Sequence, residues 1–256
     1  MMPIATPDPF TAALAAMPFW LAALCALGWN VGIFAACLLL GEWARRAFRR
    51  HRVSPPAPPL TGMEVALAVS TVLINTLITA AGMALWRWGW MRLLPNQPWR
   101  VLLDSLVLFF AMDFGMYGLH RAAHHRLIYP LIHLTHHQYE NPRPLTLFAL
   151  NPLEVLGFGG LWLLVIVIYP AASLAMVIYL TLNVAFGLIG HLGVEPMPAA
   201  WLRLPGLRFI STSTFHAEHH GDKQHNFGFY TLIWDRLFGT LSPEYERDFS
   251  RAARVT

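Results

Sequence analysis

Histidines gather in short boxes in this sequence, and their spacing suits a metal site. Among twelve histidines, six fall within residues 120–137 and three within residues 216–220. Residues three or four apart on a helix share one face, so each box presents several imidazoles in one direction. Neutral imidazole commonly ligates iron, zinc, copper and nickel. The boxes are H-x3-H at His120 and His124, and H-x2-HH at His133, His136 and His137 and again at His216, His219 and His220.

Adjacent histidines end each H-x2-HH box, which favours a site for two metal ions, because neighbouring side chains can divide between them. A cysteine-based zinc site is excluded, since Cys25 and Cys37 lack ligand spacing. No glutamate completes an H-E-x-x-H motif. Haem fits poorly because the boxes lie beyond the apolar spans. His51 stands in a run of arginines, so we interpret it as a surface residue.

Long apolar blocks separate these boxes. The chain of 256 residues is 56% hydrophobic and 12% charged, whereas a soluble domain carries roughly 25% charged residues. A bilayer span needs about 20 mainly apolar residues. The predicted spans are residues 18–41, 62–86, 99–119, 152–168 and 171–190, with the last two joined as a tight hairpin.

Basic residues predict the orientation of the spans, because cytoplasmic loops carry an excess of Lys and Arg. With residues 42–61 inside, the segments 42–61, 120–151 and 192–256 hold 5, 3 and 7 cations. Only Arg87, Arg92 and Arg100 then lie outside, and every histidine box faces the cytoplasm. The chain has a single lysine among its 18 basic residues, a bias typical of GC-rich genomes, which favours a bacterial inner membrane.

We therefore expect an all-α integral membrane helical bundle with four to five transmembrane helices and a cytoplasmic helical cap that carries the histidine boxes. Residues 1–256 form a single membrane-embedded domain in this prediction. Residues 1–98 supply the N-terminal spans, and residues 99–241 form the catalytic histidine-box region.

Seven motifs lie between Asp113 and Thr240: DFGMYGLHRAAHH (113–125), HLTHH (133–137), NPLE (151–154), HLGVEP (191–196), FHAEHH (215–220), NFG (226–228) and WDRLFGT (234–240). They resemble motifs of the fatty acid hydroxylase/sterol desaturase superfamily of membrane di-iron oxygenases. The resemblance covers half of the chain, and the first two spans match by hydropathy only. It implies two iron ions per chain, held by nine histidines: His120, His124, His133, His136, His137, His191, His216, His219 and His220.

The resemblance also implies roles for residues beside the boxes. Asp113 lies seven residues before His120 on the same helical face, and an acid inside a span is usually functional. We expect its carboxylate to hydrogen-bond a ligand histidine and fix the tautomer. His125 is expected either to support the site or to act as a ligand, and both alternatives stay open.

Four further positions carry weaker expectations. Glu154 either supports a ligand or caps the hairpin. Asp235 and Arg236 are expected to anchor the C-terminal helix, and His225 to be a solvated or supporting residue. Gln224 departs from the asparagine that relatives often carry, so no role is assigned to its side chain.

The activity implied by the resemblance is O2-dependent oxidation of an unactivated C–H bond in a membrane lipid, by hydroxylation or desaturation. Sterol, fatty acyl, carotenoid and ornithine-type lipids are all candidate substrates. No side chain beyond the metal ligands is expected to be catalytic, and no nucleic acid is expected as a partner. The chain has neither a Gly-rich dinucleotide fingerprint nor spare cysteines for an iron–sulfur centre. An external ferredoxin, cytochrome or reductase is therefore expected to donate electrons.

Two other functions stay open at this point. The first is a non-enzymatic membrane protein that binds or transports metal, which should place its ligands at mid-membrane. The second is a metal-dependent lipid hydrolase, which needs fewer ligands and an open water site.

Overall fold

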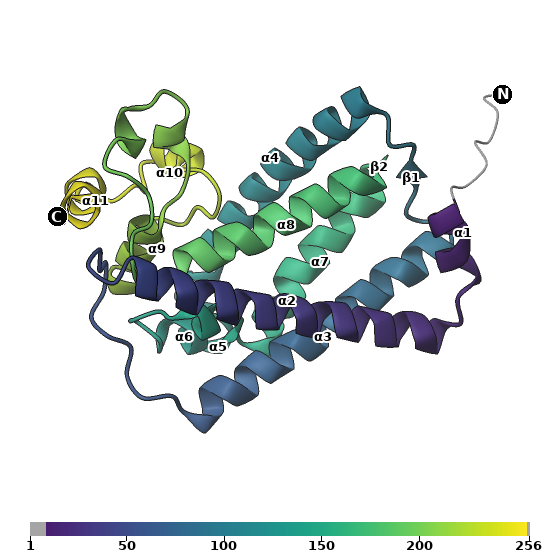
Figure 1. The fold of residues 1–256 in the computed structure, drawn as a ribbon, viewed down its shortest axis with the longest axis horizontal. Coiled ribbons are helices and arrows are strands. Elements are labelled where there is room, and N and C mark those ends of the chain that lie inside the picture. The colour runs from purple at the N-terminus through teal and green to yellow at the C-terminus, as the bar shows by residue number, and fades with distance from the viewer. Residues whose placement is uncertain (1–8, 255–256) are drawn as a thin grey trace.

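Five long helices form the body of the protein (Figure 1). The structure is a computed structural model and describes residues 9–254. Four of these helices are long and apolar enough to cross a membrane: α2 (Phe19–Ala47), α3 (Gly62–Arg87), α4 (Pro98–Ala123) and α8 (Ser173–Gly190). The fifth, α7 (Pro152–Ile168), is apolar but shorter, with 17 residues. The predicted all-α membrane bundle of four to five spans is confirmed.

Local sequence explains where these helices begin. The Thr61 side chain accepts a hydrogen bond from the Glu64 amide and caps α3. The Asn151 side chain does the same for α7 by accepting from Leu153. Helices α4 and α7 both start with a proline, whose missing N–H costs nothing in the first turn. Many large apolar side chains on the long helices are exposed, as expected for surfaces that face lipid.

Helix α4 packs against both α7 and α8, while α3 packs against α2 and α7. Buried Leu108 and Met112 of α4 meet Tyr179 of α8 in the main apolar core. At the far end of the bundle, Asp104 accepts hydrogen bonds from the Tyr169 hydroxyl and the Ala172 amide, both at 2.8 Å. A two-residue parallel ladder joins β1 (Leu93–Leu94) to β2 (Ala171–Ala172) at the same end.

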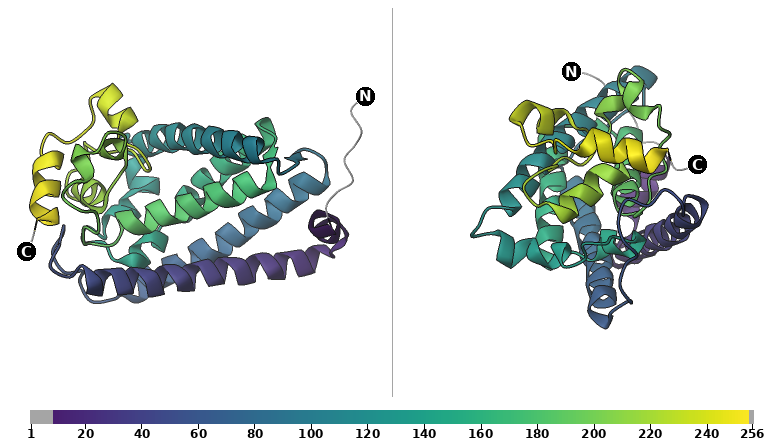
Figure 2. Two further views of the ribbon diagram at one scale, coloured as in Figure 1. Left: turned by 45° about the horizontal axis from the view of Figure 1, so that its top comes forward. Right: turned by 90° about the vertical axis from the view of Figure 1, so that its left-hand side faces the viewer.

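Short elements form a cap at the opposite end of the bundle, where α2, α4 and α8 end and α3 and α7 begin (Figures 1 and 2). The short helix α1 (Pro9–Ala16) lies at the far end instead. The cap comprises α5 (Tyr129–Ile132), α6 (Leu134–His137), η1 (Pro144–Phe148), η2 (Trp201–Arg203), η3 (Leu207–Phe209), α9 (Ser213–Gly221), α10 (Ile233–Phe238) and α11 (Tyr245–Ala253). The histidine boxes therefore meet at one end of the membrane body.

Candidate metal centre

All nine histidines predicted as ligands come together, and they form two groups. The five-histidine group contains His120, His124, His133, His137 and His219, and the four-histidine group contains His136, His191, His216 and His220. Within each group the potential ligand nitrogens lie within 4.8 Å of one another. Every member is buried except His124, which is half-buried. Each group has enough nitrogen donors to hold a metal ion.

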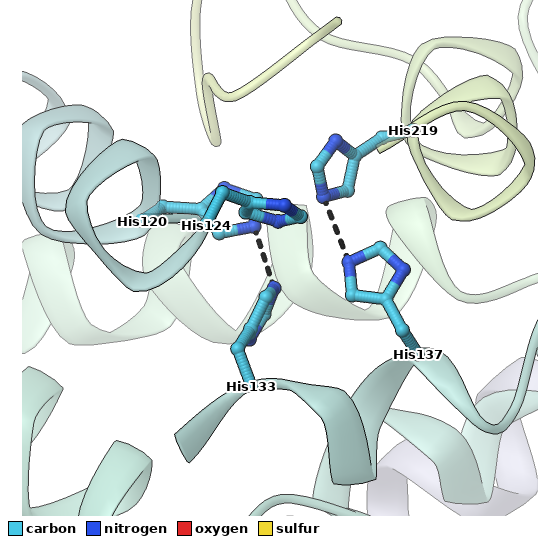
Figure 3. Close-up of side chains that lie close together, drawn as sticks. All are labelled: His120, His124, His133, His137 and His219. Atoms are coloured by element: carbon cyan, nitrogen blue, oxygen red, sulfur yellow. Dashed lines mark hydrogen bonds between the residues drawn. The ribbon is translucent and has the colours of Figure 1, made fainter. Parts of the chain in front are cut away.

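Adjacent histidines divide between the groups, as the H-x2-HH spacing predicts. In the box at α6, His136 and His137 belong to different groups, and in α9 the same is true of His219 and His220. The end of α4 supplies only the five-histidine group, whose side chains converge from α4, α6 and α9 in Figure 3. The rings of His137 and His220, one from each group, have centroids 5.0 Å apart. The two groups therefore adjoin and share α6 and α9.

The Nε2 atoms in each group lie at the separations that metal ligands adopt. The Nε2 atoms of His120 and His133 are 3.0 Å apart, and those of His137 and His219 are 3.1 Å apart (Figure 3). In the four-histidine group the corresponding distances are 3.1–3.3 Å. Nitrogens bound to one ion at about 2.1 Å stand about 3.0 Å apart along an octahedral edge and about 3.4 Å apart in a tetrahedron. The spacing fits direct coordination.

Backbone carbonyls fix which nitrogen of three histidines carries the proton. Nδ1 of His120 donates to the Phe227 carbonyl at 2.8 Å, and Nδ1 of His219 donates to the His225 carbonyl at 2.6 Å. Nδ1 of His191 donates to the Gly187 carbonyl at 2.7 Å. Because a carbonyl only accepts, each of these neutral rings has a lone pair at Nε2.

These lone pairs point into the two groups, where they would repel one another without a cation between them. The Nε2 atom of His124 is also buried and has no hydrogen-bond partner. Such an unpartnered buried nitrogen, in a group of converging lone pairs, fits a metal ligand. The donor set is therefore suited to metal ions.

Burial keeps the cap histidines neutral. Removal from water lowers the pKa of His124 to about 2, of His137 to about 3 and of His191 to about 4. The ordinary value is near 6.5, so these rings are unprotonated at neutral pH. A metal ion then need not displace a proton to bind them.

Glu154, in the first turn of α7, supports one histidine of the five-histidine group. Its Oε1 atom accepts a hydrogen bond from Nδ1 of His133 at 2.8 Å, and the side chain is buried. Since Asn151 already caps α7, the alternative in which Glu154 caps the hairpin is not needed. The carboxylate holds His133 with its Nε2 lone pair toward the group, as carboxylates commonly do for ligating histidines.

Comparison with known proteins identifies the family of the chain. A family model described as fatty acid hydroxylase matches residues 105–240, which is more than half of the sequence. The chain belongs to the fatty acid hydroxylase family. The match begins in α4 and ends just after α10, so it contains every histidine of both groups.

Individual relatives of this fatty acid hydroxylase domain are named for sterol oxidation. The mouse lathosterol oxidase is 34% identical over 151 residues, covering 57% of this chain and 48% of the relative. The Delta(7)-sterol 5(6)-desaturase of Aspergillus fumigatus is 26% identical over 198 residues, covering 75% and 54%. The zebrafish methylsterol monooxygenase 1 is 31% identical over 138 residues, covering 54% and 46%. The chain thus spans about half the length of these relatives. No solved structure matches it.

Asp113 does not contact a ligand histidine, so that prediction is wrong. Its carboxylate instead accepts hydrogen bonds from the amides of Tyr230 and Thr231, the Thr231 hydroxyl and the Trp234 indole. Seven residues along a helix correspond to about 10 Å, which is too far for contact with His120 although both share a face. Asp113 therefore fastens the segment before α10 to the middle of α4.

His125 is exposed and belongs to neither group, so its position does not support the ligand alternative. It lines the open pocket that reaches His124, and a supporting role stays a prediction. Its Nδ1 accepts a backbone hydrogen bond from Leu127. The His225 side chain pairs with Asp222 at 2.8 Å and lies outside both groups, yet its carbonyl orients His219. His51, interpreted as a surface residue, contacts the Ala252 carbonyl through Nδ1 at 2.9 Å.

Asp235 was predicted to anchor the C-terminal helix, but its contacts lie on either side of α10, where they position the site. It accepts hydrogen bonds from the amides of Phe227 and Gly228 at 2.8 Å and from the Thr240 hydroxyl. Those contacts hold the segment whose Phe227 carbonyl orients His120. Arg236 pairs with Glu246 of α11 at 3.1 Å, a structural role.

Sequence reasoning assigned no role to two polar residues that position α9. Glu195 accepts hydrogen bonds from the Thr214 amide and hydroxyl, at 2.9 and 2.6 Å, and so holds the first turn of α9. Asn226 has a positive φ of 62° and donates to the Phe215 carbonyl. Both stand in motifs already noted, HLGVEP and NFG, and their place in these motifs was the available signal.

Proposed function

We propose that the protein is an O2-dependent di-iron oxidoreductase that hydroxylates or desaturates a C–H bond of a membrane lipid such as a sterol or fatty acyl chain. The observation that carries the proposal is the pair of adjoining imidazole groups at one end of a membrane bundle, in a fatty acid hydroxylase domain. The sterol oxidation in the names of the relatives supports the lipid substrate class. Residues 1–256 act as one domain in this proposal, with residues 99–241 as its catalytic region.

The nine histidines hold one iron ion in each group in this proposal. Bound iron supplies the reduction of O2 and the oxidation of the C–H bond. The chain contributes neutral ligands that add no charge, and the carbonyls of Phe227, His225 and Gly187 keep three rings in the ligating tautomer. Glu154 gives His133 a more basic Nε2. Burial of eight of the nine histidines limits the contact of the groups with bulk water.

The substrate reaches the iron ions from the bilayer in this proposal. Aromatic side chains border the five-histidine group: the Phe229 ring lies 5.1 Å from the His120 ring and 5.4 Å from that of Phe158 on α7, between centroids. An apolar wall of this kind suits a lipid chain or ring system and offers it no hydrogen bond. In this arrangement the carbon to be oxidised is the part of the lipid that lies nearest the metal.

An external electron donor docks at the cap in this proposal. An open pocket of about 700 Å³ reaches His124, and Arg121, His125 and Lys223 are among the residues that line it. His124 is the least buried member of the five-histidine group, which makes it the natural entry point for electrons. The basic rim favours an acidic ferredoxin, cytochrome or reductase domain, because complementary charge speeds association.

We further propose that the cap faces the cytoplasm and that the membrane is a bacterial inner membrane. The support for orientation is the excess of Lys and Arg in the three segments that meet at the cap end. The support for the compartment is the arginine bias, an association with genome composition. A metal transporter is not favoured, because the ligands lie at one end of the helices and the named relatives are enzymes.

Isolated membranes test the activity. They should be given reduced nicotinamide cofactor, a ferredoxin and reductase system, membrane lipid and isotopically labelled O2. Mass spectrometry should show a lipid that gains one labelled oxygen, or that loses two hydrogens if the reaction is desaturation. Oxygen gained from labelled water would instead point to hydrolysis and overturn the proposal.

Metal analysis and two histidine variants complete the test. Gently extracted protein from iron-replete cells should hold about two iron ions per chain, and zinc in place of iron would not contradict it, because imidazole sites accept both. His219→Ala should abolish turnover and lower the iron content. His51→Ala should retain both, since its side chain lies outside both groups and contacts the Ala252 carbonyl. Normal turnover in His219→Ala would refute the assigned site.

A further inference from the structure

A basic cleft lies at the cap end of α2, and none of the nine group histidines lines it. It has a volume of about 340 Å³ and is lined by residues of the α2 end, by the segment after it and by the loop that follows His191. We call it the arginine cleft and define it by Arg45, Arg46, Arg49, Arg52, Ser54 and Gly193. Nothing in the proposed oxidation chemistry uses these residues.

The arginine cleft carries uncompensated positive charge. Glu42 also lines it and accepts from both Arg45 and Arg46, at 3.3 and 2.9 Å. Within residues 9–254, neither Arg49 nor Arg52 has a carboxylate within salt-bridge distance. Both are exposed at the cleft and free to bind an anion. Guanidinium groups match the planar geometry of phosphate oxygens and bind them with two parallel hydrogen bonds.

The walls of the cleft are fixed by backbone contacts. Arg52 bridges Val194 in antiparallel fashion, and the Val53 amide donates to the Gly193 carbonyl at 3.2 Å. Gly193 has a φ of +69°, and a Cβ there would lie 2.8 Å from the Pro142 carbonyl oxygen, so only glycine fits. The Ser54 hydroxyl is buried beside Gly193 and has no hydrogen-bond partner. The cleft is thus a preformed concave site in which the Ser54 hydroxyl is an unused hydrogen-bond donor. A flexible run of surface arginines would provide neither feature.

The depth of the cleft matches that of lipid headgroups. Trp20 and Trp43 are both largely exposed on α2, and tryptophans of this kind mark the two membrane interfaces. They are 23 residues apart, which is about 35 Å of helix against a hydrocarbon core of about 30 Å. The arginines begin two residues after Trp43, immediately outside the apolar layer. Phosphate groups of the bilayer lie at this level.

We propose that the arginine cleft is a binding site for the phosphate of an anionic phospholipid headgroup. Arg49 and Arg52 bind the phosphate oxygens, and the Ser54 hydroxyl donates to the same headgroup. A zwitterionic headgroup carries a cation that the surplus of arginines disfavours, so the site selects net negative lipids.

Short-chain lipids titrated into the full-length protein in detergent test the site. Phosphatidylglycerol should bind with clear preference over phosphatidylcholine, and Arg49→Gln/Arg52→Gln should weaken that binding about tenfold. Arg203→Gln/Arg208→Gln removes two exposed arginines from the same cap, outside the cleft, and should bind as the unaltered protein does. Arg49→Lys/Arg52→Lys keeps the charge but lacks the planar guanidinium that makes two parallel hydrogen bonds, so it should show an intermediate loss of binding.

Folding of each variant is checked by thermal unfolding and metal content, neither of which depends on lipid selectivity. If Arg49→Gln/Arg52→Gln and Arg203→Gln/Arg208→Gln lose lipid binding equally, the effect belongs to diffuse surface charge and the site is overturned. The absence of any preference for phosphatidylglycerol would overturn it too. Competition by inorganic phosphate as strong as that by phosphatidylglycerol would assign the cleft to free phosphate and overturn the lipid. Since binding is read without turnover, these outcomes are separate from any failure of the proposed oxidation.

Discussion

Replacing Glu154 by glutamine should weaken metal binding in one histidine group while leaving the other intact. The carboxylate accepts from Nδ1 of His133 at 2.8 Å in a buried setting. Glutamine keeps an oxygen that accepts the hydrogen bond, but it lacks the negative charge that makes Nε2 of His133 a stronger metal ligand. Such supporting contacts are worth about 10–100-fold in metal affinity. We expect Glu154→Gln to weaken metal affinity about tenfold, which corresponds to about 1.4 kcal/mol. Glu154→Ala should weaken it about a hundredfold, or about 2.7 kcal/mol.

A chelator titration followed by metal analysis measures this effect. Iron should leave the variant in two stages, with the ion of the five-histidine group lost first. The control is Glu246→Gln, because Glu246 also forms an ion pair in the cap, with Arg236 at 3.1 Å, and neither residue is in either group. Equal iron retention by Glu154→Gln and the unaltered protein, or equal loss in the control, would refute the reasoning.

Three further outcomes are expected. Asp113→Asn should lower the free energy of unfolding by about 1–3 kcal/mol while iron stays bound, because the NH2 of the new amide would face hydrogen-bond donors of the 230–234 segment. Loss of iron without destabilisation would contradict this. Burial lowers the pKa of His124 and His137 below the ordinary 6.5, so the unfolded chain takes up protons first as pH falls below about 6.5. Chelator-stripped protein should therefore melt at a lower temperature at about pH 5.5 than at about pH 7.5, and identical melting curves would count against buried neutral rings. A cysteine at Pro59 should resist an impermeant thiol reagent in intact cells while one at Gln97 reacts, and the reverse pattern would overturn the orientation.

The membrane helices were predictable because apolar runs of span length have few other uses in a protein. Their ends were less so. Helix α2 continues to Ala47 and α4 to Ala123, beyond the predicted apolar blocks that end at Gly41 and Leu119. Hydropathy reports contact with lipid, whereas a helix continues for as long as its backbone hydrogen bonds are favourable. The extra turn of α4 is the one that carries His120.

The division of each H-x2-HH box between two groups was predictable from local spacing, whereas His191 entered the set only through the family resemblance. The supporting contacts of the histidines were not predictable. The division of His136 from His137 follows from adjacency on a helix. The partner of His120, by contrast, is the carbonyl of Phe227, 107 residues away. Every residue has a carbonyl, so no side-chain pattern marks the one that is used. The role expected of Asp113 failed for a related reason: helical periodicity gives the face of a residue but not its distance from a site.

The backbone contacts of the histidines have a consequence for biogenesis. Chains are made from the N-terminus, and domains begin to form as they emerge. The last two metal-group histidines, His219 and His220, and the carbonyls of His225 and Phe227 follow all five long helices in the sequence. The bundle can therefore be inserted into the membrane before either group is complete. Metal loading of the proposed site would then be a late step, on a protein already in the bilayer.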